Sequence, residues 1–229
     1  MYYIKTYPLQ KIVRESECAM SIYKEVMGKD FVHLHPKLQK RYEQLEFTPF
    51  QAKGVMKNIQ GGPKYLYPFF QLGVMWKLLF PERGEDIPFT IANTPLIGQN
   101  GEKQIHWERI FYFKKKKRYF NALMSLDAKR KIIKDYLGEP SLIYSDLVMT
   151  AMADGSLQID SKDQRLVLGK IEIPLPQLFQ GLATVNECYL EEEKVFQIKV
   201  VVTNPIIGTV FAYEGEFKPY DTSNIFMDS

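Results

Sequence analysis

The sequence predicts an α+β fold in which helices near the N-terminus pack on a strongly curved antiparallel sheet. From Ile87 onward, apolar and polar residues alternate in run after run, which is typical of strands with one buried face. Short turn signals separate these runs, and connections this short have no room for crossover helices. An open sheet of about ten strands would leave exposed edges, so we expect it to close into a β-barrel.

Helical spacing dominates the residues before this sheet. Residues 13–27 contain apolar side chains at helix spacing, and Gly28 follows as a stop signal. Residues 36–45 predict a second short helix, because a proline occupies the first helical position. Residues 50–59 are expected to form a strand, which a Gly-Gly-Pro sequence then breaks.

Residues 65–80 are the most apolar segment of the chain, and we expect a helix over 64–80 that ends at Pro81. The segment falls short of the ~20 residues that a membrane span requires. A buried helix is the first interpretation. An interfacial helix or a mobile lid over an apolar cavity is the alternative.

The remaining strands follow from alternation and turn signals. Asp154-Gly155 joins two alternating runs and predicts an antiparallel hairpin over residues 142–160. Residues 174–179 predict a short turn or helix that could close one barrel end. We expect a single domain over residues 1–229, with 1–20 as a candidate N-terminal extension and 221–229 as a polar tail. The expected strands span residues 88–97, 104–113, 118–126, 130–137, 142–152, 157–160, 165–173, 183–190, 195–203 and 206–217.

Composition excludes some classes of function. The net charge of +3 is too small for a dedicated nucleic-acid-binding protein. The aromatic content of 14% favours a large aromatic interior or a cavity. Cys18 and Cys188 lie far apart, and residues 1–8 lack the apolar core of a signal peptide. We therefore expect reduced thiols in a cytoplasmic protein.

Arg109 is the most informative residue of the sequence. It shares one face of a strand with large apolar side chains, namely Ile105, Trp107, Phe111 and Phe113. A lone buried charge is costly, so Arg109 should have an anionic or hydrogen-bonding partner inside the fold.

The candidate partners of Arg109 within the chain are Glu187 and Glu214, each of which alternates with apolar residues. One interpretation is a buried pair that fixes the barrel register. The other is that Arg109 holds the carboxylate or phosphate of a ligand.

Two other clusters allow two interpretations each. His33 and His35 could reach one metal from an extended segment, but no third ligand has suitable spacing, so we predict no metal site. His35 is expected to cap or hydrogen-bond the start of the following helix. The run Lys114, Lys115, Lys116, Lys117 and Arg118 is expected to be a solvated hairpin tip, with weak contact to anionic lipid head groups as the alternative.

Catalytic signatures are largely absent from the sequence. It has no Gly-x-Gly-x-x-Gly after a strand, no phosphate-binding Gly-x-x-x-x-Gly-Lys, and no Gly-x-Ser-x-Gly. The sequence therefore predicts no cofactor and favours a protein that is not an enzyme.

Eight short motifs occur in a recognisable order and together cover about residues 21–219. They are Leu34-His35-Pro36-x-Leu38-Gln39-x-x-Tyr42, Gly54-Val55-Met56, Leu79-Phe80-Pro81-Glu82, Ile87-Pro88-Phe89, Trp107-x-Arg109-x-Phe111-x-Phe113, Pro174-Leu175-Pro176, Pro205-Ile206-Ile207-Gly208 and Tyr213-Glu214-Gly215-x-Phe217.

In this order the motifs resemble an uncharacterised bacterial family, domain of unknown function forty-one sixty-six. The resemblance implies no assigned activity and no catalytic residues. Some members follow a saccharopine-dehydrogenase-like domain, which implies an accessory or ligand-handling role beside a redox enzyme. We do not expect that nucleotide-binding domain in this chain.

These observations favour a binding protein for an apolar or lipid-like ligand that carries an acidic group. Trp107, Phe111 and Phe113 would line the barrel cavity, Arg109 would hold the acid, and the helix over 64–80 would cover the entrance. An enzyme that uses Glu187 or Glu214 beside Arg109 is the first alternative. A ligand-free interaction module is the second.

Overall fold

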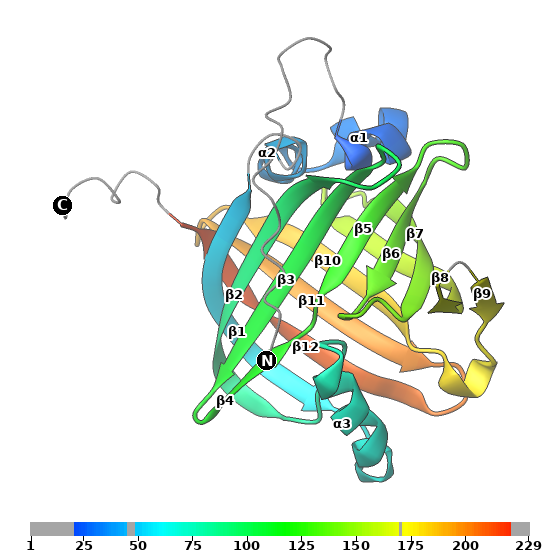
Figure 1. Ribbon diagram of the computed structural model, residues 1–229. Helices are drawn as coiled ribbons and strands as arrows, with labels where there is room; N and C mark the ends of the chain where they lie inside the picture. The colour runs from blue at the N-terminus through cyan, green and yellow to red at the C-terminus, as the bar shows by residue number, and fades with distance from the viewer. Residues whose placement is uncertain (1–20, 45–48, 170, 221–229) are drawn as a thin grey trace, which may run out of the picture.

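The computed structural model describes residues 21–44, 49–169 and 171–220. The expected N-terminal extension, the polar tail, Cys18 and the first part of the helix predicted over 13–27 lie outside these residues. Within them, the structure confirms the predicted architecture of a curved antiparallel sheet with N-terminal helices (Figure 1).

Ten strands of the described chain form a closed antiparallel barrel, because β8 and β10 pair and join the two ends of the sheet. β4 (Lys116–Tyr119) pairs with β3 and β9 (Ile171–Pro174) pairs with β8, and both lie outside the closed ring. The ring runs in the order β10 (Leu182–Leu190), β11 (Val195–Asn204), β12 (Gly208–Pro219), β1 (Phe50–Gly61), β2 (Gly84–Ile97), β3 (Lys103–Phe113), β5 (Ala122–Asp127), β6 (Ile132–Leu137), β7 (Ile143–Ala151) and β8 (Leu157–Leu168).

Three strand predictions differ from the structure. Residues 165–173 were expected as one strand, but they fall on the end of β8 and on β9, which pair with each other. Residues 118–126 were expected as one strand, but β4 and β5 are separate because Asn121 accepts the backbone N–H of Arg109 with its side chain (3.2 Å). Residues 157–160 belong to one long strand, β8, rather than to a short one. Its inward polar residue Gln164 does not break the strand, because it bonds the backbone of Gly181 in both directions (2.8 and 2.7 Å).

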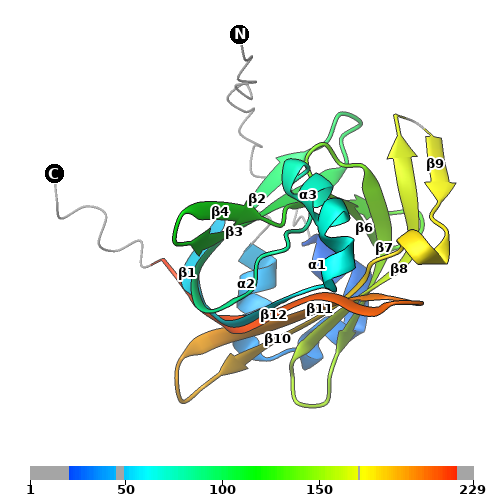
Figure 2. The ribbon, with the colours of Figure 1, turned by 90° about the horizontal axis from the view of Figure 1, so that it is seen from below.

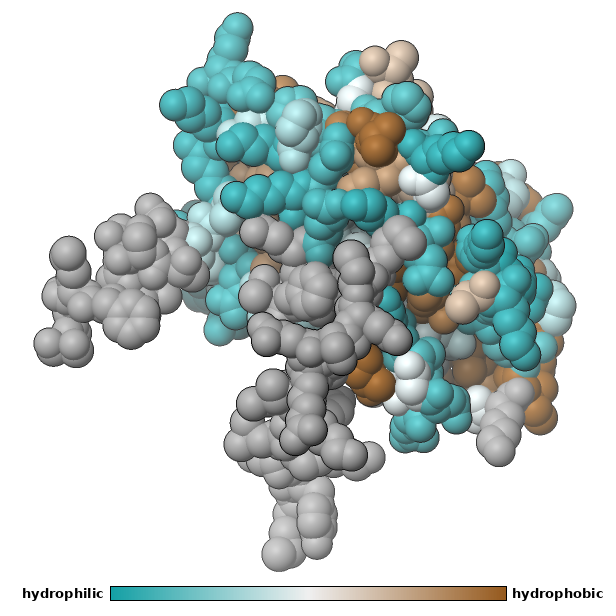
Figure 3. Space-filling model, turned by 90° about the horizontal axis from the view of Figure 1, so that it is seen from above, coloured by the Kyte–Doolittle hydropathy of each residue, from teal (hydrophilic) through white to brown (hydrophobic). Residues whose placement is uncertain are grey.

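Helices lie at both ends of the barrel (Figures 1 and 2). One end carries α1 (Ile22–Met27), the 3₁₀ helix η1 (Gly28–His33) and α2 (Pro36–Gln44), the helix predicted over residues 36–45. The other end carries the 3₁₀ helix η2 (Lys64–Leu66), α3 (Tyr67–Met75) and the 3₁₀ helix η3 (Gln177–Phe179). Viewed from the α1 and α2 end, the described surface is mainly hydrophilic, with scattered apolar side chains (Figure 3).

α3 corrects the prediction for residues 64–80. The helix ends at Met75, because Lys77 takes a left-handed backbone conformation (φ +51°) and the N–H of Leu78 returns to the carbonyl of Gly73 (2.8 Å). The first interpretation, a buried helix, is wrong. Phe69 is 60% exposed and Met75 72% exposed, whereas only Phe70 and Gly73 of this helix are buried.

The barrel interior is aromatic, and the predicted inward face of β3 is confirmed. Ile105, Trp107, Arg109 and Phe111 are all buried. Phe111 packs against Phe80, which enters from the segment after α3, with a centroid distance of 4.9 Å. This core fills the middle of the barrel, so space for a ligand has to lie toward one end.

Candidate functional site

A pocket of about 390 Å³ lies between α3 and the adjacent end of the barrel. Both the covering helix and the barrel wall contribute apolar side chains to it, and η3 forms the far side. The residues that enclose it include Phe69, Phe70, Leu72 and Trp76 from α3 and its C-terminal end, Phe120, Leu137, Val202 and Val210 from the barrel, and Leu178 and Phe179 from η3.

The polar side chains of the wall are occupied by the fold itself. Asn204 donates to the carbonyls of Gln177, Leu178 and Gln180 (2.7–3.0 Å) and thereby fixes η3 against the barrel. Gln164 bonds the backbone of Gly181, as described above. Among the described residues that line the pocket, no side chain is a carboxylate, an ammonium or a guanidinium group. The wall therefore suits an uncharged, apolar molecule.

Glu139 ties the C-terminal end of α3 to the barrel. Its side chain accepts from Asn121 (2.6 Å), lies 3.1 Å from the ring nitrogen of His106 and forms an ion pair with Lys77. Its backbone N–H donates to the carbonyl of Trp76 (2.6 Å). The hydrogen bond with His106 and those with Lys77 and Asn121 lower the pKa of Glu139 to about 2, although burial opposes them. One end of the helix over the pocket is thus firmly held.

Arg109 lies in the barrel interior, one layer behind the pocket. Its guanidinium donates to the hydroxyl of Tyr213 (3.3 Å) and stacks over the ring of Phe120, 4.3 Å from the ring centroid. Phe120 also lines the pocket, so its ring separates Arg109 from the cavity.

The two glutamates predicted as partners of Arg109 have other partners. Glu187 pairs with Arg41 (3.0 Å) deep in the barrel. Glu214 pairs with Lys199 (3.2 Å) at the surface, because the buried residues of β12 on either side of it are Tyr213 and Gly215. Alternation with Val210 and Ala212 predicted the wrong side for Glu214, because Val210 is buried whereas Ala212 and Glu214 are only partly buried.

Asp135 is the carboxylate that acts on Arg109. It lies on β6 between the inward residues Ile133 and Leu137, and it is 8% exposed. Burial raises the pKa of Asp135 to about 6, and the charge of Arg109 opposes this shift. Asp135 Oδ1 and Arg109 Nε have no hydrogen-bond partner among the described residues. Sequence reasoning missed Asp135, but the same period-two argument that found Arg109 would have found it.

A second buried arginine fills the barrel end below α2. The guanidinium of Arg41 lies 4.6–5.8 Å from the centroids of five aromatic rings, and its partner Glu187 also accepts from the hydroxyl of Tyr42 (3.1 Å). Burial raises the pKa of Glu187, and Arg41 and Tyr42 oppose it. Leu38, Arg41 and Tyr42 share one helix face, a signal that sequence reasoning overlooked.

The other predicted site residues do not line the pocket beneath α3. Trp107 donates to the hydroxyl of Tyr23 (2.9 Å), and Phe113 packs beside Phe80 (5.8 Å). His35 accepts from the backbone N–H of Lys37 (3.2 Å), as expected of a group at the start of α2, and it pairs with Glu191. Within the described chain, no group of three or more metal-ligating side chains is close enough to hold an ion.

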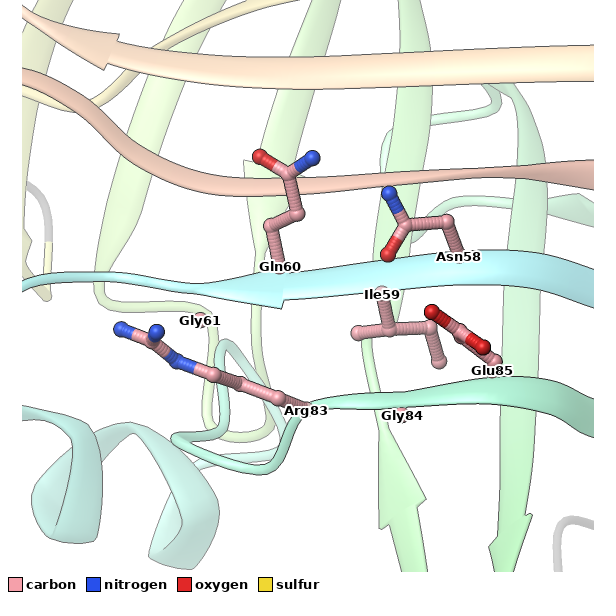
Figure 4. Close-up of a pocket in the computed structure, with 7 residues that line it drawn as sticks. All are labelled: Asn58, Ile59, Gln60, Gly61, Arg83, Gly84 and Glu85. Carbon is pink, nitrogen blue, oxygen red and sulfur yellow. The ribbon is translucent and has the colours of Figure 1, made fainter.

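A different hollow, of about 500 Å³, lies at the ends of β1 and β2 (Figure 4). It is lined by polar residues such as Asn58 and Gln60, with Glu85 on the neighbouring strand and Arg83 just before that strand. The guanidinium of Arg83 donates a hydrogen bond to the carbonyl of Gly62 (2.6 Å). This hollow is open to solvent, so it is a weaker candidate site than the pocket beneath α3.

Residues 34–217 match the family model described as a domain of unknown function (DUF4166). The chain belongs to this family. It is also 43% identical, over 185 residues, to an uncharacterized protein named YndH of Bacillus subtilis (strain 168), a match that covers 81% of this chain and 90% of that protein. No solved structure matches. The family assignment confirms the resemblance predicted from the motifs, and the match spans α2, α3 and the barrel up to Phe217 in β12 but leaves out α1 and η1.

Proposed function

We propose that this member of DUF4166 binds an apolar, lipid-like small molecule between α3 and the barrel. The observation that carries the proposal is the pocket itself, which has an apolar wall, no charged lining side chain and a volume of about 390 Å³. That volume falls within the range of roughly 300–1,000 Å³ typical of small-molecule sites. α3 covers the molecule, in line with the lid that was the second interpretation of residues 65–80.

In this proposal the acidic group of the predicted ligand contacts Arg109 only if a side chain moves. Arg109 lies behind the ring of Phe120, so a ligand carboxylate reaches it only after that ring turns aside. Otherwise the head group stays at the pocket entrance in water. Comparing dodecanoic acid with dodecanol separates these cases, because only contact with Arg109 makes the acid bind more tightly and makes Arg109→Leu remove that difference.

Filling the pocket tests the proposal. Val202→Phe adds a ring to the wall, and Val148→Phe adds the same ring to a side chain that is 47% exposed on the outer surface. Dodecanol titration is followed through tryptophan emission, because Trp76 lines the pocket. We expect the first variant to lose most of its affinity and the second to bind like the wild type. Equal binding by both folded variants contradicts the proposal.

An enzyme is the second candidate, and Asp135 is the observation that favours it. A buried carboxyl group with a pKa of about 6 that the charge of Arg109 influences suits general acid–base work. Asp135 does not line the pocket, so substrate would have to pass Phe120 and Leu137. A turnover of any bound ligand that disappears in Asp135→Asn would support this candidate. The accessory role beside a redox enzyme and the cytoplasmic location stay predictions.

A further inference from the structure

Exposed apolar side chains gather around the opening of the pocket. Tyr65, Phe69 and Met75 belong to η2 and α3, Leu178 and Phe179 to η3, and Ile206 to the turn between β11 and β12; all six are more than half exposed. These elements lie at one end of the barrel, opposite α1 and α2 (Figures 1 and 2). Because these side chains project from four separate elements, they surround the opening instead of forming one flat interface.

The basic hairpin tip lies at the same end. The turn at Lys114 and Lys115 joins β3 to β4, and its base contacts the segment after α3, since Glu82 pairs with Arg118 (2.5 Å) and Lys116 (3.7 Å). Lys114, Lys115 and Lys117 are exposed and form no ion pair among the described residues. This end of the barrel therefore carries positive charge as well as the exposed apolar side chains.

We propose that this end of the barrel docks on an anionic lipid bilayer. The exposed apolar side chains around the opening enter the boundary between head groups and acyl chains, and the hairpin lysines bind the lipid phosphates. Exposed apolar side chains alone would also suit a protein partner. The hairpin lysines that form no ion pair favour a partner surface of negative charge. In the described part of the chain no helix is long and apolar enough to cross a bilayer.

This docking goes beyond the proposed ligand binding, and it also explains the position of the pocket. A lipid-like ligand is scarce in water and abundant in a membrane. Docking at this end brings the mouth of the pocket to the bilayer, where α3 would open toward the lipid phase.

Flotation with vesicles of phosphatidylcholine, with and without phosphatidylglycerol, tests the inference with the full chain. We expect binding to the anionic vesicles and little to the zwitterionic ones. Reversing Lys114, Lys115 and Lys117 to Glu should lower binding at least about tenfold. The matched control reverses Lys29, Lys40 and Lys129, which are exposed but not on the hairpin, and should bind nearly as wild type.

The apolar part has its own variants. Phe69→Ser with Met75→Ser should weaken vesicle binding without lowering the melting temperature, because both side chains are mostly in water. Three results would each overturn the proposal. They are an equal loss of vesicle binding in the two triple-lysine variants, equal binding of the wild type to both vesicle types, and association of the barrel with itself through α3. Val202→Phe should keep vesicle binding while losing dodecanol, so failure of one proposal is distinguishable from failure of the other.

Discussion

Two arginines lie inside this barrel, and they are neutralised in different ways. Arg41 has a carboxylate at 3.0 Å and a surrounding set of aromatic rings. Arg109 has a tyrosine hydroxyl and one ring at close range, and Asp135 acts on it only through the longer-range field. The first arrangement is a direct ion pair, whereas Arg109 and Asp135 form none; both sites contain buried polar atoms without a hydrogen-bond partner among the described residues.

Breaking the Arg41 pair should destabilise the fold. Glu187→Gln leaves a guanidinium uncompensated among aromatic rings, and we expect a loss of about 3–5 kcal/mol in the free energy of unfolding, measured in urea. Replacing both partners, Arg41→Met with Glu187→Leu, should recover most of it. As a control, Glu214→Gln removes a surface pair, which is worth at most about 1 kcal/mol. A Glu187→Gln variant as stable as this control would contradict the assignment.

Asp135 should make stability fall as pH rises through the mildly acidic range. Its pKa is raised from 3.8 to about 6 in the folded protein, so between these values the folded chain holds a proton that the unfolded chain releases. The contribution of Asp135 to the free energy of unfolding is therefore complete below about pH 4, and it is smaller by up to about 3 kcal/mol above pH 6. Asp135→Asn should remove this slope in urea unfolding, and Asp30→Asn, at an exposed site, should not. If the free energy of unfolding changed with pH in the same way in the wild type and in Asp135→Asn, this prediction would be wrong.

α3 illustrates what alternation and composition can and cannot predict about an element. The apolar run predicted a helix correctly, but it did not predict where the helix ends or which way it faces, because its partners come from β6, β11 and η3, far along the sequence. Strands such as β3 were easier, because period two alone decides which side chains point inward. On β12 that rule failed, since both faces near Glu214 are apolar in sequence.

The anchor of α3 should depend on the Glu139 carboxylate. Glu139→Gln removes the ion pair with Lys77 and weakens the contact with His106, so the amides of Trp76 and Leu78 should exchange about twofold to fivefold faster with solvent. In the wild type the anchor is complete above about pH 4.5 and is lost as pH falls toward 2, because the pKa is depressed. Hydrogen exchange followed by mass spectrometry measures both effects. Unchanged exchange in this segment would show that the backbone bonds suffice.

The whole molecule is a barrel with two unlike ends. One is filled by α1, α2 and the Arg41–Glu187 pair, and the other holds the pocket under α3 with apolar and basic groups around it. The sequence predicted the barrel from strand number and short turns, but not its closure through β8 and β10, since pairing between distant strands leaves no local signal. The pocket was unpredictable for the same reason: none of the side chains that enclose it belongs to the strand around Arg109.

A crystal structure with bromododecanol, read by the anomalous signal of bromine, tests the central claim most directly. Binding beneath α3 predicts a bromine peak within the space bounded by Phe120, Val202 and Phe179. A peak elsewhere in the barrel or only on its outer surface, with this pocket empty at saturating ligand, would contradict the account.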